Sequence, residues 1–155
     1  MKAALDPFAR LIGQWFGTGL SPVAPGTVGS LGALPLFFLL RELSWAVYWG
    51  VALLVIMLGV WASERCAEIL GDDDPGSVVI DEVAGVLIAL GFVRFAPLWV
   101  LAAAWVCFRV LDITKPSLID KAQQLRPAGV GIMADDVLAG LAAGALTSLA
   151  APFFA

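Results

Sequence analysis

The chain has 155 residues, of which 61% are hydrophobic and only 14% are charged, and it contains six Trp and nine Phe. Soluble globular domains rarely reach this apolar content, so the composition indicates an integral membrane protein with a single domain over residues 1–155. The net charge of −4 provides no basic stripe, which argues against a nucleic-acid partner.

The first segment, residues 1–19, is mildly amphipathic and lacks a continuous apolar core of signal-peptide length. We expect it to be retained and to lie along the membrane surface. Residues 17–30 then gather glycines, prolines and hydroxyls ahead of an apolar run. Backbone N–H groups at such a helix start, with Thr27 or Ser30 as cap, suit an anion, whereas the plainer interpretation is a turn that leads into a membrane helix.

Four apolar runs follow, at residues 28–40, 45–62, 83–108 and 137–155. The second run has the length of a membrane-spanning helix, because its 18 residues cover roughly 27 Å at about 1.5 Å per residue. The first run is short by itself, but a helix there can be extended through Arg41 and Glu42 if those side chains reach the interface.

The third run is long enough for one tilted helix, but Arg94 falls near its middle and Pro97 would break its hydrogen bonding. A hairpin that turns at residues 94–97 removes both objections, and its arms of 11 and 14 residues would be short or partly re-entrant. The alternative, a single crossing, would split the motifs described below across the bilayer.

The hairpin places residues 1–27, 63–82 and 109–136 on one face of the membrane. Seven of the nine Lys and Arg residues then lie on this face, which the positive-inside rule assigns to the cytoplasm. We therefore predict an all-α fold, a polytopic membrane helical bundle with short or re-entrant helices and a site on its cytoplasmic side.

Two acid pairs, Asp81-Glu82 and Asp135-Asp136, stand directly before apolar runs. Carboxylates at a membrane edge are costly unless a cation neutralises them, so the pairs predict metal ligation. The competing interpretation is a helix start whose acids complement the helix dipole. A glycine follows each pair, four residues after Asp81 and five after Asp135, where a second backbone or a ligand could come close.

Arg109, Asp112 and Lys115 recur at three-residue spacing and so share one helical face. They could form intrahelical ion pairs, or they could supply two cations for phosphate oxygens and one more carboxylate for a metal. The acids of residues 72–74 lie in a glycine-flanked loop and are more typical of a solvated charge run.

The ordered motifs resemble the phosphatidylglycerophosphatase A family over residues 17–140. They comprise residues 19–30, 81–85, 108–116 and 131–136. The resemblance implies a magnesium-dependent phosphatase of the bacterial inner membrane that removes the terminal phosphate from phosphatidylglycerophosphate to give phosphatidylglycerol.

This chemistry assigns a role to each motif, because hydrolysis of a phosphate monoester requires neutralising a dianion and activating a nucleophile, for which water fits best and an aspartate remains the alternative. The competing function is a small ion transporter or channel that uses the paired carboxylates in broken helices. The expected Mg²⁺ ligands are Asp81, Glu82, Asp135 and Asp136. The residues assigned to catalysis are Asp81, Asp112, as a further ligand or general base, and Thr27. Those expected to bind phosphate are Arg109, Lys115, Gly26, Thr27 and Ser30.

Overall fold

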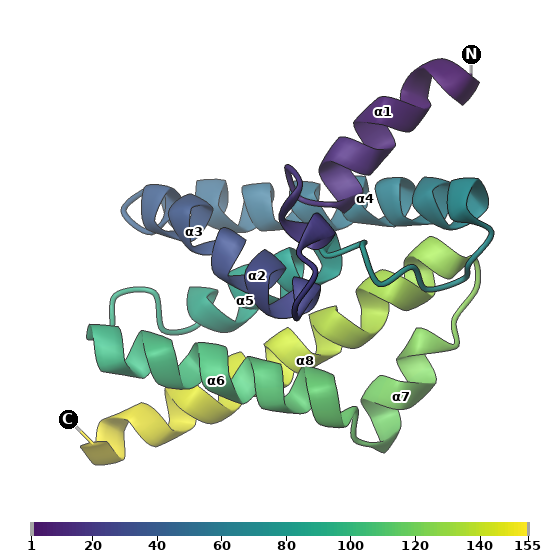
Figure 1. The fold of residues 1–155 in the computed structure, drawn as a ribbon. Coiled ribbons are helices and arrows are strands. Elements are labelled where there is room, and N and C mark those ends of the chain that lie inside the picture. Colours follow the sequence, from purple (N-terminus) through teal and green to yellow (C-terminus); the bar gives the residue numbers. More distant parts are fainter. Residues whose placement is uncertain (1, 155) are drawn as a thin grey trace.

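The computed structural model describes residues 2–154, and every regular element within that range is a helix. Figure 1 shows these helices as a bundle from which the N-terminal helix projects. The α-helices are α1 Lys2–Gly13, α2 Pro25–Gly32, α3 Leu34–Leu40, α4 Trp45–Leu70, α5 Ile80–Gly91, α6 Leu98–Thr114, α7 Ser117–Gln123 and α8 Ala128–Ala150, and short 3-10 helices cover Thr18–Leu20 and Ala151–Phe154.

Among residues 2–154, two helices are long and apolar enough to cross a membrane. They are α4, Trp45–Leu70, and α8 continued by the 3-10 turn that follows it, Ala128–Phe153, with 26 residues each. The first is eight residues longer than the apolar run that predicted it, and the Ser44 hydroxyl caps its start by accepting a hydrogen bond from the Val47 amide. These helices, together with the all-helical fold, confirm the prediction of a helical membrane protein.

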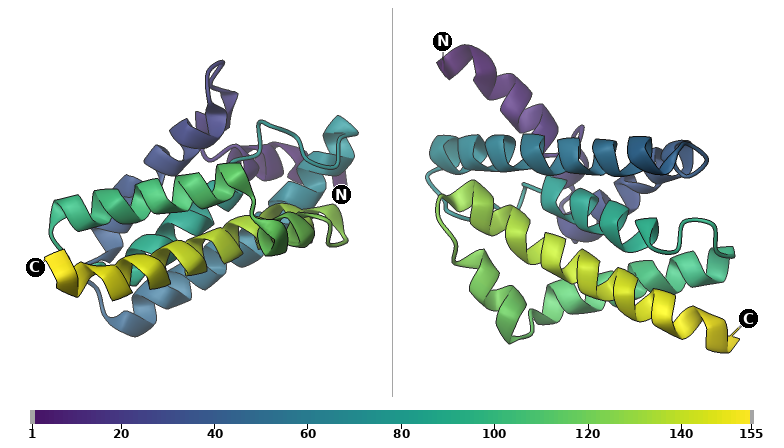
Figure 2. Two further views of the ribbon diagram at one scale, coloured as in Figure 1. Left: turned by 90° about the horizontal axis from the view of Figure 1, so that it is seen from below. Right: turned by 180° about the vertical axis from the view of Figure 1, so that it is seen from behind.

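The centre of the bundle is α5, which packs against α2, α3, α4, α6 and α8. Each of its residues from Val83 to Gly91 is buried, so neighbouring helices surround it rather than lipid. The two further views show α6 and α8 running alongside this central helix (Figure 2). Its first turn, which carries Asp81 and Glu82, emerges at the end of the bundle where the site lies.

The hairpin is confirmed, because the chain turns between α5 and α6 and not within a single helix. Helix α5 has 12 residues and so measures roughly 18 Å, too short to cross about 30 Å of hydrocarbon alone. At the turn, the guanidinium of Arg94 is buried and lies 4.4 Å from the ring centre of Phe95 and 5.4 Å from that of Tyr48. Aromatic faces thus receive the charge that a continuous helix would have left in the bilayer.

The first apolar run does not extend as a helix through Arg41 and Glu42. The run is divided into α2 and α3, and α3 ends at Leu40 with Arg41 as its cap. Pro35 provides the physical reason, because it has no N–H to donate and its ring clashes with the carbonyl four residues earlier.

Helix α8 begins at Ala128, earlier than the apolar run at residues 137–155 predicted. Its N-cap residue, Pro127, supplies no side-chain hydrogen bond, and the Gly129 amide instead donates to a Glu64 carboxylate oxygen on α4 at 2.7 Å. A carboxylate from a neighbouring helix thus satisfies one of the free amides at the start of α8. Asp135 and Asp136 consequently lie about two turns inside α8, where the helix-dipole interpretation does not apply.

Candidate active site

A polar cavity of about 290 Å³ opens where the starts of α2 and α5, the end of α6 and the second turn of α8 converge. It brings together residues that are more than 50 positions apart in the sequence. The acid pairs and the row on α6 therefore meet at one end of the bundle, as the hairpin predicted. Its charged lining residues are Asp74, Asp81, Glu82, Arg109, Asp112, Lys115, Asp135 and Asp136.

Three carboxylates form the innermost part of the cavity. Asp81, Glu82 and Asp136 each offer one oxygen, and the three oxygens lie within 4.8 Å of one another. A close crossing of α5 and α8 brings them together: a Cβ added to Gly140 would lie 2.5 Å from the carbonyl oxygen of Gly85. Only glycines permit this approach, and it sets Asp136 beside the first turn of α5. We call Asp81, Glu82 and Asp136 the acid triad.

The acid triad lacks enough hydrogen-bond donors for its buried oxygens. Among residues 2–154, Asp81 Oδ1, Glu82 Oε2 and Asp136 Oδ2 are buried without a hydrogen-bond partner. Unpaired buried carboxylate oxygens cost several kcal/mol each, and mutual repulsion adds to that cost. Oxygen ligands at this spacing suit a hard divalent cation such as Mg²⁺, so the residues fit the metal that the sequence predicted.

Arg109 borders the acid triad from α6. Its Nη1 donates to Asp112 Oδ2 at 2.5 Å and lies 3.8 Å from Glu82 Oε1. Arg109 and Asp112 thus form the intrahelical ion pair that was one of the two alternatives for their spacing. Its Nε is buried without a partner among the described residues. Arg109 thus lines the cavity with one N–H that no described residue accepts.

Lys115 follows the last residue of α6 in a left-handed conformation, with φ 41°, and its Nζ donates to Asp135 Oδ2 at 2.7 Å. Burial lowers the pKa of Lys115, but the hydrogen bond to Asp135 and that residue's charge outweigh it, so the pKa lies above its ordinary value. The other oxygen of Asp135 accepts from the Asp136 amide. Asp135, expected to join the metal ligands, is therefore paired with lysine and lies outside the acid triad.

The glycine- and proline-rich segment reaches the cavity through Pro25 and Gly26. A Cβ on Gly26 would lie 2.1 Å from Glu82 Oε1, so the backbone of α2 lies directly against the acid triad. The expectation that Thr27 or Ser30 caps this helix was wrong, because the cap is Ala24 without a side-chain hydrogen bond. The Ser30 hydroxyl donates to the Thr27 carbonyl inside α2, and neither residue lines the cavity.

Sequence reasoning missed Asp74. It lines the cavity, and its Oδ2 accepts a hydrogen bond from Gln123 Nε2 on α7 at 2.6 Å. Its neighbour Asp73 instead pairs with Arg126 at 2.7 Å, and both side chains are exposed. The local signal for Asp74 is the following Pro75-Gly76 turn, which directs this end of the loop back toward α5.

Comparison with known proteins gives a consistent family. The family model described as Phosphatidylglycerophosphatase A matches residues 11–151. Phosphatidylglycerophosphatase A of Escherichia coli is 41% identical over 85% of this chain and 77% of its own, and the Haemophilus influenzae protein of the same name is 38% identical over 88% and 84%.

A Bacteroides thetaiotaomicron protein named "Putative phosphatidylinositol-3-phosphatase" is 42% identical over 84% of this chain and 86% of its own. No solved structure matches. The matched region contains the whole cavity, from Pro25 to Asp136. The chain therefore belongs to the phosphatidylglycerophosphatase A family and is a phosphatase.

Proposed function

We propose that this protein hydrolyses the terminal phosphate monoester of phosphatidylglycerophosphate, which yields phosphatidylglycerol and inorganic phosphate, and that the reaction requires Mg²⁺. The observation that carries the proposal is the acid triad with its unpaired oxygens, set in one cavity with Arg109 and Lys115. Such a cavity combines ligands for a divalent cation with cations for a phosphate dianion. The names of the Escherichia coli and Haemophilus influenzae relatives supply the substrate.

In this proposal Asp81, Glu82 and Asp136 would hold Mg²⁺, and Asp135, which pairs with Lys115, would be a further ligand. The metal supplies charge neutralisation of the phosphate and a lowered pKa for a bound water. Arg109 and Lys115 hold phosphate oxygens and stabilise the charge that develops on them.

The first turn of α2 supplies further donors, because the amides at the start of a helix have no acceptor inside it. Those of Gly26 and Thr27 are the ones closest to the cavity wall that Gly26 forms, and they favour an anion there. The Thr27 and Ser30 hydroxyls do not contact the phosphate directly in this proposal, since neither residue lines the cavity.

Water is the nucleophile. Its oxygen attacks phosphorus in line with the ester oxygen, the bond from phosphorus to that oxygen breaks, and the departing alkoxide takes up the proton that Asp112 has received from the attacking water, which gives the alcohol of the product lipid and restores the Asp112 carboxylate. Asp112, a buried carboxylate whose Oδ2 accepts from Arg109, receives the proton of the attacking water.

We further propose that the chain crosses the bacterial inner membrane several times, with this cavity on the cytoplasmic side. The cavity end carries most of the chain's Lys and Arg residues, as the positive-inside rule requires. The lipid then keeps its acyl chains in the bilayer while its headgroup reaches the acid triad.

The test is phosphate release by purified protein in mixed micelles, with Mg²⁺ and then with excess EDTA. We expect release from phosphatidylglycerophosphate that EDTA abolishes and Mg²⁺ restores. Phosphatidylinositol 3-phosphate is the second substrate to assay, because one relative carries that name. Faster release from the inositol lipid would replace the proposed substrate, and release that persists in EDTA would remove Mg²⁺ from the proposal. If folded protein released no phosphate from either lipid, ion flux through liposomes would test the transport alternative.

A further inference from the structure

A second unpaired polar group lies close to the cavity, on the apolar side of Arg109. The indole Nε1 of Trp105 is buried and has no hydrogen-bond partner among residues 2–154. Trp105 precedes Arg109 by four residues, which places it on the same face of α6, one turn farther from the acids. A buried indole N–H normally has an acceptor, so this N–H is a donor that a carbonyl or similar oxygen of a ligand could use.

Trp105 also lines an apolar groove of about 200 Å³ between α2–α3 on one side and α6 on the other. Leu90 of α5 also lines this groove. Helices α2, α3 and α6 all pack against α5 (Figure 1). The walls of the groove include Leu31 and Phe38, and no charged residue lines it within the described chain.

The groove and the polar cavity lie along the same helices, α2, α5 and α6. On α6, Arg109 lines the cavity, and Trp105, Ala102 and Leu98 line the groove, at spacings of four, three and four residues that keep them on one face. On α5, Glu82 lines the cavity and Leu90 the groove. From Arg109 to Leu98 the distance along α6 is roughly 16 Å, close to half of the bilayer's hydrocarbon thickness of about 30 Å.

The order of chemical groups along this face matches that of a phosphorylated glycerolipid. Cations come first, then an indole N–H, then only apolar side chains; the lipid presents phosphates, then ester carbonyls, then acyl chains. We propose that the groove binds one acyl chain of the substrate and that Trp105 Nε1 donates a hydrogen bond to an ester carbonyl of that lipid. This inference rests on the proposed function and adds an acyl and ester subsite to it.

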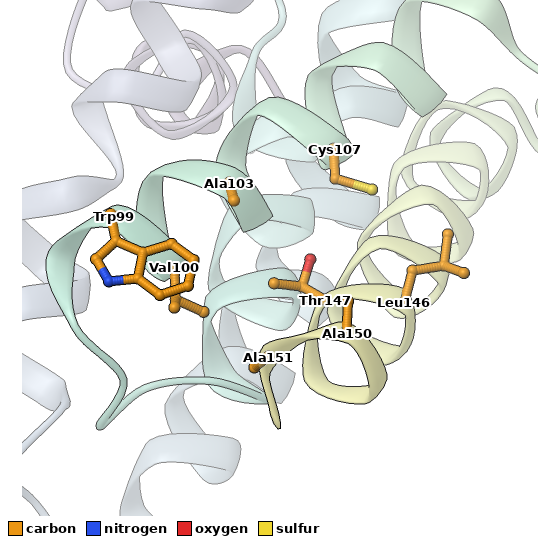
Figure 3. A pocket seen from close by; sticks show the side chains of 8 residues that line it. All are labelled: Trp99, Val100, Ala103, Cys107, Leu146, Thr147, Ala150 and Ala151. Carbon is orange, nitrogen blue, oxygen red and sulfur yellow. The ribbon is translucent and has the colours of Figure 1, made fainter. Parts of the chain in front are cut away.

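A larger apolar pocket, of about 400 Å³, lies elsewhere on α6 and provides the matched comparison. Figure 3 shows Ala103 and Cys107 of α6 facing Thr147 and Ala150 of α8 across it. The Thr147 hydroxyl already donates to the Ala143 carbonyl. At four-residue spacing this face of α6 continues from Cys107 to Leu111, which lines a further apolar pocket, and not to Arg109.

Two adjacent alanines on α6 therefore line different pockets. Ala102 lines the groove and Ala103 lines the pocket of Figure 3, and both are exposed. The test compares Ala102→Phe with Ala103→Phe on dibutanoyl and dipalmitoyl phosphatidylglycerophosphate. In Ala102→Phe we expect kcat/KM for the dipalmitoyl lipid to fall about tenfold, because a displaced chain misplaces the phosphate, and the dibutanoyl value to change less than about twofold. Ala103→Phe should match the wild type on both lipids.

The hydrogen bond is tested separately with Trp105→Phe, which keeps an aromatic ring and removes the N–H. Wild-type protein should turn over the diester lipid with a KM about fivefold lower than that of the diether analogue, which has no carbonyl. In Trp105→Phe the two lipids should have equal KM values. A purely structural role of Trp105 would change both lipids alike and leave their ratio as in the wild type.

The outcomes distinguish failure of the proposed phosphatase activity from failure of the acyl and ester subsite. If wild-type protein released no phosphate from either diester lipid, the proposed function would fall and the subsite with it. If it turned over both while Ala102→Phe and Ala103→Phe behaved alike, the acyl groove would be refuted and the phosphatase activity would stand. An unchanged diester-to-diether ratio in Trp105→Phe would refute the hydrogen bond.

Discussion

The protein has two clusters of acids that differ in their surroundings, the loop at residues 72–74 and the acid triad. In the loop at residues 72–74, each carboxylate has a partner: Asp72 accepts from the Asp74 amide, Asp73 pairs with Arg126, and Asp74 accepts from Gln123. In the acid triad of Asp81, Glu82 and Asp136, three buried oxygens have none among the described residues. The density of acids therefore does not identify the site; burial without a partner does.

The largest effect should come from the acid triad. Asp136→Asn removes one ligand charge, and we expect turnover to fall at least about a hundredfold. Phosphate release at saturating Mg²⁺ measures it. The same variant should unfold, in EDTA, at a temperature no lower than the wild type, because it relieves repulsion among buried carboxylates. Near-normal activity in both Asp136→Asn and Asp81→Asn would remove the acid triad from the mechanism.

Arg109→Lys keeps the positive charge beside the acid triad but replaces the planar fork that bonds Asp112 and faces the cavity. Lysine cannot reproduce a bidentate contact, so we expect kcat/KM to fall about thirtyfold. Steady-state kinetics of phosphate release measures the change. The matched control is Arg126→Lys in the exposed pair with Asp73, which should leave kcat/KM unchanged. Equal effects in the two variants would erase the distinction between the regions.

Gly26→Ala tests whether the backbone at the start of α2 helps to position Glu82 of the acid triad and Arg109. The new Cβ would lie 2.1 Å from Glu82 Oε1 and 3.2 Å from a terminal nitrogen of Arg109, so both side chains must shift. We expect activity to fall about tenfold because the acids and the guanidinium lose their relative positions. The control is Gly50→Ala on α4, where a Cβ meets nothing within 4 Å. A fully active Gly26→Ala would place the catalytic geometry elsewhere in the cavity.

The main features of the fold followed from local physics. Arg94 and Pro97 could not lie inside one membrane helix, and the hairpin that they required brought the two acid pairs to the same end of the bundle. The interruption of the first apolar run also has a local cause, Pro35. The hydropathy of the run gave no sign of this interruption. These features depend on residues within a few positions of each other in the chain.

Features that depend on distant contacts could not be read in the same way. Helix α8 begins at Ala128. The amide of the next residue, Gly129, donates to Glu64, which lies 65 residues before Gly129 in the chain. Asp135 pairs with Lys115, 20 residues away, which the sequence assigned to phosphate. Asp74 reaches the cavity through the fold of its loop and its bond to Gln123 on α7.

Asp74 therefore provides an intermediate case between the two regions. Its charge acts on Lys115 and raises that residue's pKa, although less than Asp135 does. Asp74→Asn would remove an anion from the cavity wall and so reduce repulsion of the phosphate dianion. We expect KM to fall about threefold with kcat unchanged, as measured by initial rates over a substrate series. A loss of kcat comparable to that of Asp136→Asn would make Asp74 a member of the catalytic set.

Asp73→Asn should have the smallest effect, with activity within about twofold of the wild type. The hydrogen bond and charge of Arg126 lower the pKa of Asp73, so any stability from this pair is present above the unfolded-state pKa of about 3.9 and is lost as pH falls through the lower folded-state value. Thermal unfolding of the variant and the wild type should thus coincide at strongly acidic pH and differ only slightly at neutral pH. An inactive Asp73→Asn protein that still folds would mean that exposure and pairing do not separate the loop from the site, and the comparison between the two regions would fail.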